Sequence, residues 1–211
     1  MVEKVDLPQR RFPAVILAGG LSRRMGGGDK GLLQLGDRPI LGHVIERLRP
    51  QVSALALNAN GDPSRFAAFG LDVIADSVPD FAGPLAGILA ALSWAGAIAP
   101  QATHVLTTPA DTPFLPHDVV ARLQAAIRGP SDSAVAARAG RRHPVVGLWP
   151  VRCRDELEKA VRQEGLRKVE AWTDRVNARL VGFDDVTLDP FFNVNTPNDL
   201  AAARDLIAVN P

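Results

Sequence analysis

Cysteine is nearly absent from this sequence, because Cys153 is the single one among 211 residues. An internal disulfide and a cysteine-based zinc cluster are therefore excluded, and a reducing compartment, the cytoplasm, is the simpler expectation. An excess of charge is missing too, since 24 basic and 23 acidic residues leave a net charge of +1. A nearly neutral chain has no electrostatic reason to bind a nucleic acid or a membrane surface.

The first residues of the sequence have little apolar character, and we expect no secretory leader in them. Residues 1–11 contain no apolar run, so we expect a flexible lead-in rather than a signal peptide. Residues 81–103 carry no charged side chain, and this length matches a membrane span. The stretch is mostly alanine and glycine and lacks flanking basic and aromatic anchors. It predicts a buried helix that begins at Pro84, with a membrane span as the weaker alternative.

Short apolar runs alternate with helical patterns along the chain. Helical spacing is found at residues 39–48, 116–127, 151–162 and 166–176, in the stretch from 84 and in the stretch from 196. Strands are expected at residues 14–18, 54–57, 71–75, 104–108, 133–137 and 144–149 and near 180, with a basic turn at 138–142. This alternation predicts one α/β domain, a three-layer, Rossmann-like arrangement with helices on both faces of a mostly parallel sheet.

Polar residues follow four successive expected strands. They are Gly19 to Lys30 after the first strand, Asn58 and Asn60 after the second, Asp76 after the third and Asp111 after the fourth. Ligands of parallel α/β sheets bind at the carboxyl ends of the strands. The sequence therefore predicts a binding crevice that these residues share.

The loop from Leu17 to Gly26 is the most informative segment. Its glycines let backbone N–H groups approach phosphate oxygens closely, and Arg23, Arg24 and Lys30 add positive charge. Lys30 is not followed by Ser or Thr, which excludes a Walker A motif, and the glycine spacing differs from the dinucleotide fingerprint. The loop predicts a site for the phosphates of a nucleoside triphosphate, and a solvated surface turn is the alternative.

Three other carboxylate and amide residues complete the predicted nucleotide site. Asp111 lies between Pro109 and Pro113, and Mg²⁺ typically takes one or two carboxylates together with phosphate oxygens and waters. Asp111 is therefore the metal candidate, with an Asx-turn or helix cap as the alternative. Asn58 and Asp76 are candidates for hydrogen bonds to a base or ribose, although both also suit a turn.

The remaining candidates concern a second substrate. Asn193 and Asn195 lie on the same side of an extended segment and suit a second substrate or the metal shell, with a turn and helix cap as the alternative. The basic turn at 138–142 suits an anionic substrate or a solvated hairpin tip. His143 is interpreted as structural or as a substrate contact. Cys153 has no histidine or other general-base pattern around it, so we do not expect a nucleophile there.

From Ile16 to about Leu200, these residues resemble the molybdenum cofactor guanylyltransferase family of the MobA type. The motifs that carry the resemblance are residues 17–27, 29–33, 83–87, 109–113, 143–144 and 193–197. The loop alone is shared by many nucleotidyltransferases, whereas Ala18-Gly19-Gly20 combined with the late Asn193 to Pro197 motif is more specific. Ala110 departs from the pattern, because the family often has cysteine at that position.

The resemblance implies a nucleotidyltransferase fold and Mg²⁺-dependent transfer of GMP from GTP to the terminal phosphate of molybdopterin, with release of pyrophosphate. It also implies transient contacts with proteins of molybdenum insertion and molybdoenzyme maturation. The roles that it implies are nucleotide contacts by Leu17, Ala18, Gly19, Gly20, Asn58 and Asp76, catalysis by Lys30, Arg24 and Asp111, metal binding by Asp111, and molybdopterin contacts by Asn193, Asn195 and His143.

Four alternatives to this activity stay open at the level of the sequence. Two are a cytidylyltransferase that acts on the same pterin and a nucleotidyltransferase that acts on a sugar phosphate. A nicotinamide oxidoreductase would need the dinucleotide fingerprint, which this chain lacks. A non-catalytic nucleotide sensor would bind GTP without needing Asp111 or a metal.

Overall fold

The computed structural model describes residues 12–19, 29–78 and 83–209, and its centre is a seven-stranded sheet in the order β5-β4-β1-β6-β8-β7-β9. The strands are β1 (Ala14–Leu17), β4 (Leu55–Asn58), β5 (Asp72–Ile74), β6 (His104–Pro109), β7 (Ala134–Arg138), β8 (Arg141–Pro150) and β9 (Arg179–Gly182). Strands β5, β4, β1 and β6 are parallel, β8 runs antiparallel to β6 and β7, and β9 is parallel to β7. The predicted mostly parallel sheet is confirmed.

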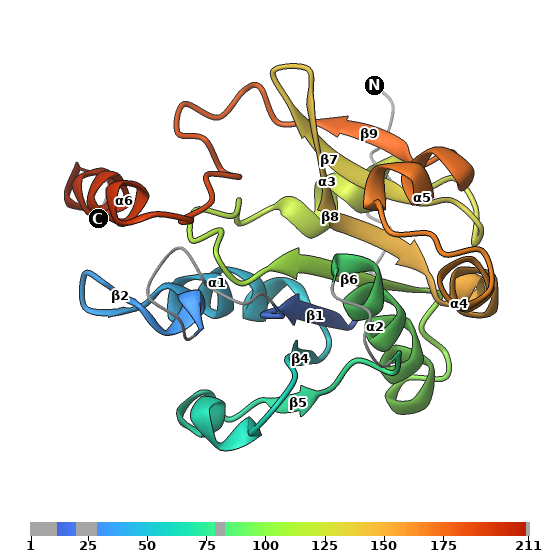
Figure 1. Ribbon diagram of the computed structural model, residues 1–211. Helices are drawn as coiled ribbons and strands as arrows, with labels where there is room; N and C mark the ends of the chain where they lie inside the picture. The colour runs from blue at the N-terminus through green and yellow to red at the C-terminus, as the bar shows by residue number, and fades with distance from the viewer. Residues whose placement is uncertain (1–11, 20–28, 79–82, 210–211) are drawn as a thin grey trace.

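Helices cover both faces of this sheet (Figure 1). They are α1 (Ile40–Leu48), α2 (Pro84–Ile98), α3 (Val119–Ala126), α4 (Arg154–Arg162), α5 (Val169–Arg175) and α6 (Pro197–Val209). Alternate residues of β1 enter different cores: Ala14 and Ile16 pack with α1 and α3, whereas Val15 packs with α2, α4 and α5. This period of two is what a strand buried on both faces requires, and it produces the predicted three layers.

The uncharged stretch forms α2, which begins at Pro84 as predicted. Pro84 has no backbone N–H, and the first turn of a helix leaves that donor unpaired in any case. The helix is apolar on all sides and packs between the sheet and α4, which accounts for its composition. Within the described ranges, no helix is long and apolar enough to cross a membrane.

The predicted basic turn at 138–142 is wrong in its extent. Only Ala139 and Gly140 form the turn between β7 and β8, and both have positive φ angles of 46° and 74°. A two-residue turn of this kind matches the twist of the flanking strands, so Arg138, Arg141 and Arg142 become strand residues. Arg138 pairs with Asp189 and donates to the carbonyl oxygen of Leu188, while the other two arginines lie at the start of β8.

Several shorter elements differ from the expected ones. The helix predicted at 116–127 begins only at Val119, and the one predicted at 166–176 begins at Val169. Short 3-10 turns and a small hairpin were not predicted: η2 (Lys30–Leu32), η3 (Arg49–Gln51), η4 (Pro63–Phe69), η5 (Val151–Cys153), β2 (Gln34–Leu35) and β3 (Arg38–Pro39). These segments are shorter than the windows in which hydrophobic periodicity is visible.

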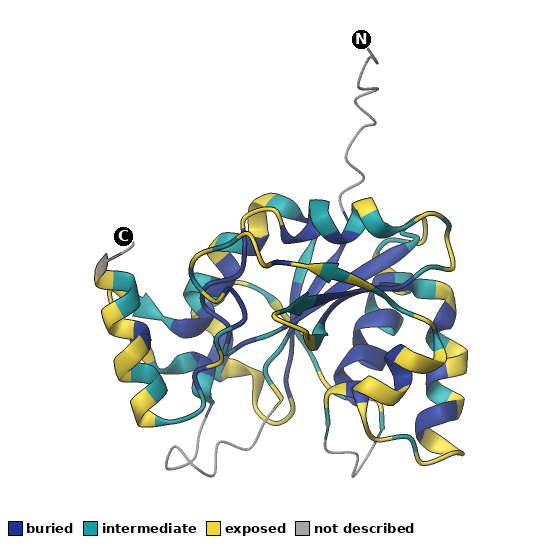
Figure 2. Cartoon of the chain, turned by 90° about the horizontal axis from the view of Figure 1, so that it is seen from above, coloured by how far each residue is buried: buried dark blue, intermediate teal, exposed yellow. Residues whose placement is uncertain are grey.

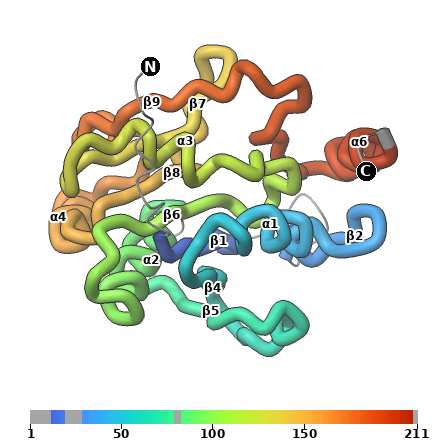
Figure 3. The backbone as a smooth tube through the Cα atoms, turned by 180° about the vertical axis from the view of Figure 1, so that it is seen from behind, coloured from blue at the N-terminus to red at the C-terminus, as the bar shows by residue number. Residues whose placement is uncertain are grey.

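The last helix, α6, lies at one side of the molecule beside the β2 hairpin (Figures 1 and 3). A separate apolar cluster holds it there, with Leu35, Phe114, Val194 and Ala203 among its buried members. Because Val194 belongs to this cluster, residues 193–196 are fixed close to the end of β6. The exposed residues of the molecule lie mainly on the outer sides of the helices and on the loops, around a buried sheet (Figure 2).

Candidate active site

The carboxyl ends of four parallel strands lie level with one another. Leu17 pairs with both Asn58 and Pro109, and Asn58 pairs with Ile74. A cavity of about 1090 Å³ opens at this edge, as the sequence predicts for the polar residues that follow these strands. Its volume is at the upper end for a small-molecule site, so it has room for a nucleotide and a second substrate.

Residues 17–19 carry the backbone of β1 into the cavity. The amide N–H of Ala18 donates to the carbonyl oxygen of Asn58 over 2.8 Å, and the carbonyl oxygen of Leu17 accepts from Ala110 over 3.0 Å. Gly19 is exposed and lines the cavity. Gly20, Arg23 and Arg24, three of the predicted site residues, lie outside the residues that the structure describes.

Asp76 is held by two asparagine side chains. Its Oδ1 accepts from Nδ2 of Asn58 over 2.9 Å, and its Oδ2 accepts from Nδ2 of Asn60 over 2.7 Å. The amide N–H of Asp76 donates back to Oδ1 of Asn60 over 2.9 Å. The structure therefore brings together the two predicted nucleoside residues and adds Asn60, which the sequence analysis placed at the same strand end without a role.

Gly87 of α2 makes this arrangement possible. A Cβ atom added at Gly87 would lie 2.5 Å from Oδ1 of Asn58 and 3.1 Å from Cδ2 of Leu17. Since Asn58 is only 2% exposed and is tied to Asp76, its amide has little space in which to retreat. The glycine at this position lets the start of α2 approach the strand end closely.

We expect Gly87→Ala to displace the Asn58 amide and to weaken binding of the predicted nucleotide about tenfold. The steric overlap costs about 1–3 kcal/mol of unfolding free energy, although alanine favours a helix by up to about 1 kcal/mol. Gly96→Ala in the same helix is the matched control, because its added Cβ meets Val151 at an ordinary 3.5 Å. Denaturant unfolding and nucleotide titration measure both variants. Equal behaviour of the two would contradict the role of Gly87.

Asp111 lines the cavity, and one of its carboxylate oxygens has no hydrogen-bond partner among the described residues. That oxygen is the buried Oδ1, while the main-chain oxygen of Asp111 accepts from the N–H of Val194 over 2.9 Å. Burial raises the pKa of the Asp111 carboxyl, and the positive charge of Lys30 opposes that rise. An orphaned buried oxygen is costly unless it gains a partner such as a cation.

The donor set around Asp111 fits Mg²⁺. Among the described residues, no group of three or more His, Cys, Asp or Glu side chains could hold a metal. A site with a single carboxylate is typical of Mg²⁺ that is bound jointly with substrate phosphates and water. Asp111 therefore suits a metal that arrives with a nucleotide, and its assignment as metal ligand stays a prediction.

The Lys30 side chain is held in place by Asn195, which lies just before the last helix. Its Nζ donates to Oδ1 of Asn195 over 2.5 Å, across 165 residues of sequence. The N–H groups of Asn195 and Thr196 both donate to Oδ2 of Asp199, and the N–H of Asp199 donates to Oγ1 of Thr196. This reciprocal cap at the start of α6 fixes Asn195. Asn195 thus contacts the lysine, whereas its predicted partner Asn193 lines the cavity and accepts from Thr112 over 3.1 Å.

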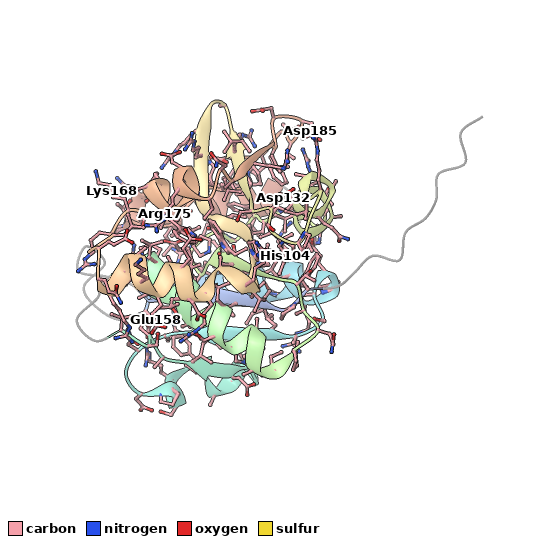
Figure 4. The ribbon with its side chains drawn as sticks, turned by 90° about the vertical axis from the view of Figure 1, so that its right-hand side faces the viewer. His104, Asp132, Glu158, Lys168, Arg175 and Asp185 are labelled. Atoms are coloured by element: carbon pink, nitrogen blue, oxygen red, sulfur yellow. The ribbon has the colours of Figure 1, made fainter. Side chains whose placement is uncertain are left out.

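The far side of the cavity is basic and partly aromatic. Arg141 and Arg142 from β8 and Arg167 and Lys168 ahead of α5 line it, and Figure 4 labels Lys168. Sequence reasoning missed Arg167 and Lys168, because only the packing of α5 on β8 brings residues so distant in the chain to the cavity. The available signal was a basic pair in the first turn of the helix expected at residues 166–176.

His143 lines the same side of the cavity. Its ring lies against Phe191, with centroids 4.5 Å apart and planes 32° apart. Burial and the neighbouring charge of Arg141 lower the pKa of His143. The ring is therefore neutral near pH 7 and offers a flat, uncharged surface between cations.

Two other candidates lie away from this chemistry. Burial raises the pKa of the Cys153 thiol to about 12, which agrees with the expectation that it is not a nucleophile. Nε2 of His104 donates to the carbonyl oxygen of Asp132, and its Nδ1 shares a hydrogen bond with Oγ1 of Thr103. Figure 4 shows His104 beside Asp132 and away from Lys168. It does not line the cavity.

Known proteins resemble this chain over most of its length. The family model of the MobA-like NTP transferase domain matches residues 14–176. A molybdenum cofactor guanylyltransferase of Bradyrhizobium sp. is 54% identical over 93% of this chain and 93% of its own. One of Rhodopseudomonas palustris is 55% identical over 91% of this chain and 92% of its own.

Solved structures share the fold. Molybdopterin-guanine dinucleotide biosynthesis protein A of Archaeoglobus fulgidus superposes with a TM-score of 0.70 and 24% identity, over 94% of this chain and all of its own. The family model covers more than half of the chain, and the curated relatives exceed half identity over nearly full length. By these matches and by the shared fold, the chain belongs to the molybdenum cofactor guanylyltransferases, within the MobA-like NTP transferase family.

Proposed function

We propose that this protein transfers GMP from GTP to the terminal phosphate of molybdopterin and releases pyrophosphate. One observation carries the proposal: a single cavity places Lys30 and the orphaned oxygen of Asp111 between a nucleoside end and a basic, aromatic end. The nucleoside end contains Asn58 and Asp76, and the opposite end contains Arg141, His143 and Lys168. The names of the relatives support the same substrates.

The reaction joins two anionic substrates, so the protein must hold them close and offset their charge. The attacking phosphate is already ionised near neutral pH and needs no strong base. Binding at the two ends of one cavity makes the encounter effectively unimolecular. Lys30, pinned by Asn195, supplies a fixed positive charge for the phosphates of GTP.

Asp111 would hold Mg²⁺ through the oxygen that lacks a partner. When bound, Mg²⁺ offsets the negative charge that builds up on the phosphates in the transition state. The carboxylate is placed for this by the hydrogen bond between its own main-chain oxygen and Val194. Arg24 completes the proposed catalytic set on the leaving-group side.

The basic, aromatic end is the proposed acceptor site. The His143 ring, backed by Phe191, suits one face of a flat pterin ring, and a neutral imidazole avoids a charge against that ring. Arg141 and Lys168 suit the acceptor phosphate. Asn193 lies between this end and Asp111, where it would orient the acceptor.

Guanine is the proposed base, although the fold alone does not select it. A 4-diphosphocytidyl-2C-methyl-D-erythritol synthase of Anaerococcus prevotii superposes with a TM-score of 0.69 at 14% identity, over 94% of this chain and 96% of its own. A cytidylyltransferase acting on the same pterin, which the sequence leaves open, is the second candidate. The same proposal places the protein in the cytoplasm as one domain over residues 1–211, with transient contacts to molybdenum-insertion and molybdoenzyme-maturation proteins.

A transfer assay with each labelled nucleoside triphosphate tests this function. Purified protein is incubated with Mg²⁺ and molybdopterin, and pyrophosphate and the nucleotidylated pterin are both measured. We expect the two products with GTP and a loss of both with EDTA. A product formed only from CTP would replace guanylyl by cytidylyl transfer. Binding of GTP without either product would identify a nucleotide sensor and overturn the proposal.

A further inference from the structure

Arg65, in the 3-10 turn η4, has no role in the chemistry described above, yet it lines the cavity. Its Nε donates to Oδ2 of Asp29 over 2.5 Å, and its Nη2 donates to the carbonyl oxygen of Asn60 over 2.6 Å. Its Nη1 donates to the carbonyl oxygen of Asp62, and the guanidinium lies 4.5 Å from the centroid of the Phe66 ring. Three hydrogen bonds and a ring contact therefore fix one arginine.

Two of these contacts reach a neighbour of a proposed GTP ligand. Asp29 directly precedes Lys30, which lines the cavity and is the proposed phosphate ligand. Asn60 clamps Asp76 with both ends of its amide. The guanidinium thus connects the beginning of the phosphate site to the clamp of the nucleoside site, although the two belong to different loops.

The ion pair between Arg65 and Asp29 also changes the electrostatics of the cavity. The Asp29 side chain is 18% exposed and lines the same cavity as Lys30. An unpaired carboxylate there would repel a triphosphate, because the repulsion between like charges is weakly screened near a partly dry site. The ion pair with Arg65 offsets that charge at short range.

We infer that Arg65 is a positioning residue for GTP: it neutralises Asp29 and holds the Asp29–Lys30 turn in place, so that the triphosphate binds more tightly than the nucleoside alone. This inference rests on the proposed function for the identity of the nucleotide. It concerns binding of GTP and not transfer to the pterin. Arg65 acts through Asp29 and need not touch the phosphates.

A double-mutant cycle on Arg65 and Asp29 tests the inference. The variants are Arg65→Gln, Asp29→Asn and the pair together, and Kd is measured for GTP and for guanosine by competition titration. We expect Arg65→Gln to raise the Kd for GTP about tenfold, as for loss of a charge-assisted hydrogen bond. Asp29→Asn should raise it less, because this variant also removes the carboxylate that would repel the triphosphate. The Kd for guanosine should change less than about twofold, since the bonds between Asn60 and Asp76 do not include Arg65. The double variant should be no weaker than the singles, because the two residues act as one unit.

The protein contains a matched control for this cycle. Arg122 pairs with Asp185 over 2.7 Å, donates to the carbonyl oxygen of Gly182 over 2.6 Å and lies 4.1 Å from the centroid of the Phe183 ring. Neither Arg122 nor Asp185 lines the cavity, and Figure 4 shows Asp185 far from Lys168. Arg122→Gln and Asp185→Asn should leave both Kd values unchanged, with a similar shift in Tm.

Each other outcome overturns the inference. Equal losses for GTP and guanosine would mean that Arg65 only maintains the local fold. Additive losses in the double variant would mean that Arg65 binds the phosphates itself. An unchanged Kd for GTP in Arg65→Gln would mean that Arg65 has no role in GTP binding. Because the wild-type Kd for GTP is measured without pterin, failure of the proposed transfer would appear in the transfer assay and not here.

Discussion

Replacing Asp111 by asparagine is expected to lower kcat for guanylyl transfer about 100- to 1000-fold, with little effect on the fold. Asparagine keeps the shape of the side chain but removes the negative charge that Mg²⁺ requires. Loss of one group that stabilises developing charge in a closed site has effects of this size. The measurement is single-turnover transfer with saturating GTP and Mg²⁺.

The stability of the same variant should move in the opposite direction to its activity. The Asp111 pKa lies above its ordinary value of 3.8, chiefly through burial, so ionisation costs more free energy in the folded than in the unfolded state. Folding therefore favours the protonated carboxyl, and the native state loses relative stability as pH rises through this pKa. Without metal, Asp111→Asn should unfold at the same Tm as the wild type at neutral pH, or at a higher one.

Asp72→Asn, on the exposed edge strand β5, is the control for removal of a carboxylate. It should keep full activity and a wild-type response to Mg²⁺. The Asp111 assignment would be refuted if Asp111→Asn retained transfer within a few-fold of the wild type. It would also be refuted if the variant lost activity only because it unfolded.

Lys30→Ala should raise the Kd for GTP about 10- to 100-fold. Removal of a charged hydrogen-bond donor to phosphate costs about 1.5–3 kcal/mol, which corresponds to that range. The loss also frees Oδ1 of Asn195, which now accepts from the lysine over 2.5 Å. Titration calorimetry with GTP and Mg²⁺ measures the change.

Lys168→Ala is the natural comparison, because Lys168 is an exposed lysine at the other end of the cavity. It should raise KM for molybdopterin and leave the Kd for GTP unchanged. The pair of variants thus separates the two proposed ends of the site. If Lys168→Ala raised the Kd for GTP as much as Lys30→Ala does, the cavity would have no separate acceptor end.

The fold was largely predictable from the sequence because its signals are local. The apolar run from Ala14 to Leu17 is short and is followed by glycine, which is sufficient to expect a buried strand and a loop. Pro84 and an uncharged stretch that is too long for a strand together predict helix α2. The misplaced turn at 138–142 shows the limit, since only two of its residues have the backbone angles of a turn. Pairing with β7 extended β8 toward the turn, which periodicity alone does not show.

The residues that stand at strand ends could be identified from local sequence patterns alone, and they supply most of the proposed nucleotide side of the cavity. Asn58, Asp76 and Asp111 follow parallel strands, and parallel strands align their carboxyl ends whatever the helices between them do. A glycine-rich loop after the first strand adds phosphate chemistry for the same local reason.

The contacts that hold the site together join residues far apart in the chain and became visible in the folded protein. The bond from Lys30 to Asn195 spans 165 residues, and the one from Arg65 to Asp29 spans 36. The basic side from Arg141 to Lys168 forms because α5 packs on β8. Such contacts depend on the mutual placement of whole elements through apolar packing, and no residue spacing encodes them. For that reason the supporting residues, unlike the predicted ligands, emerged only from the folded molecule.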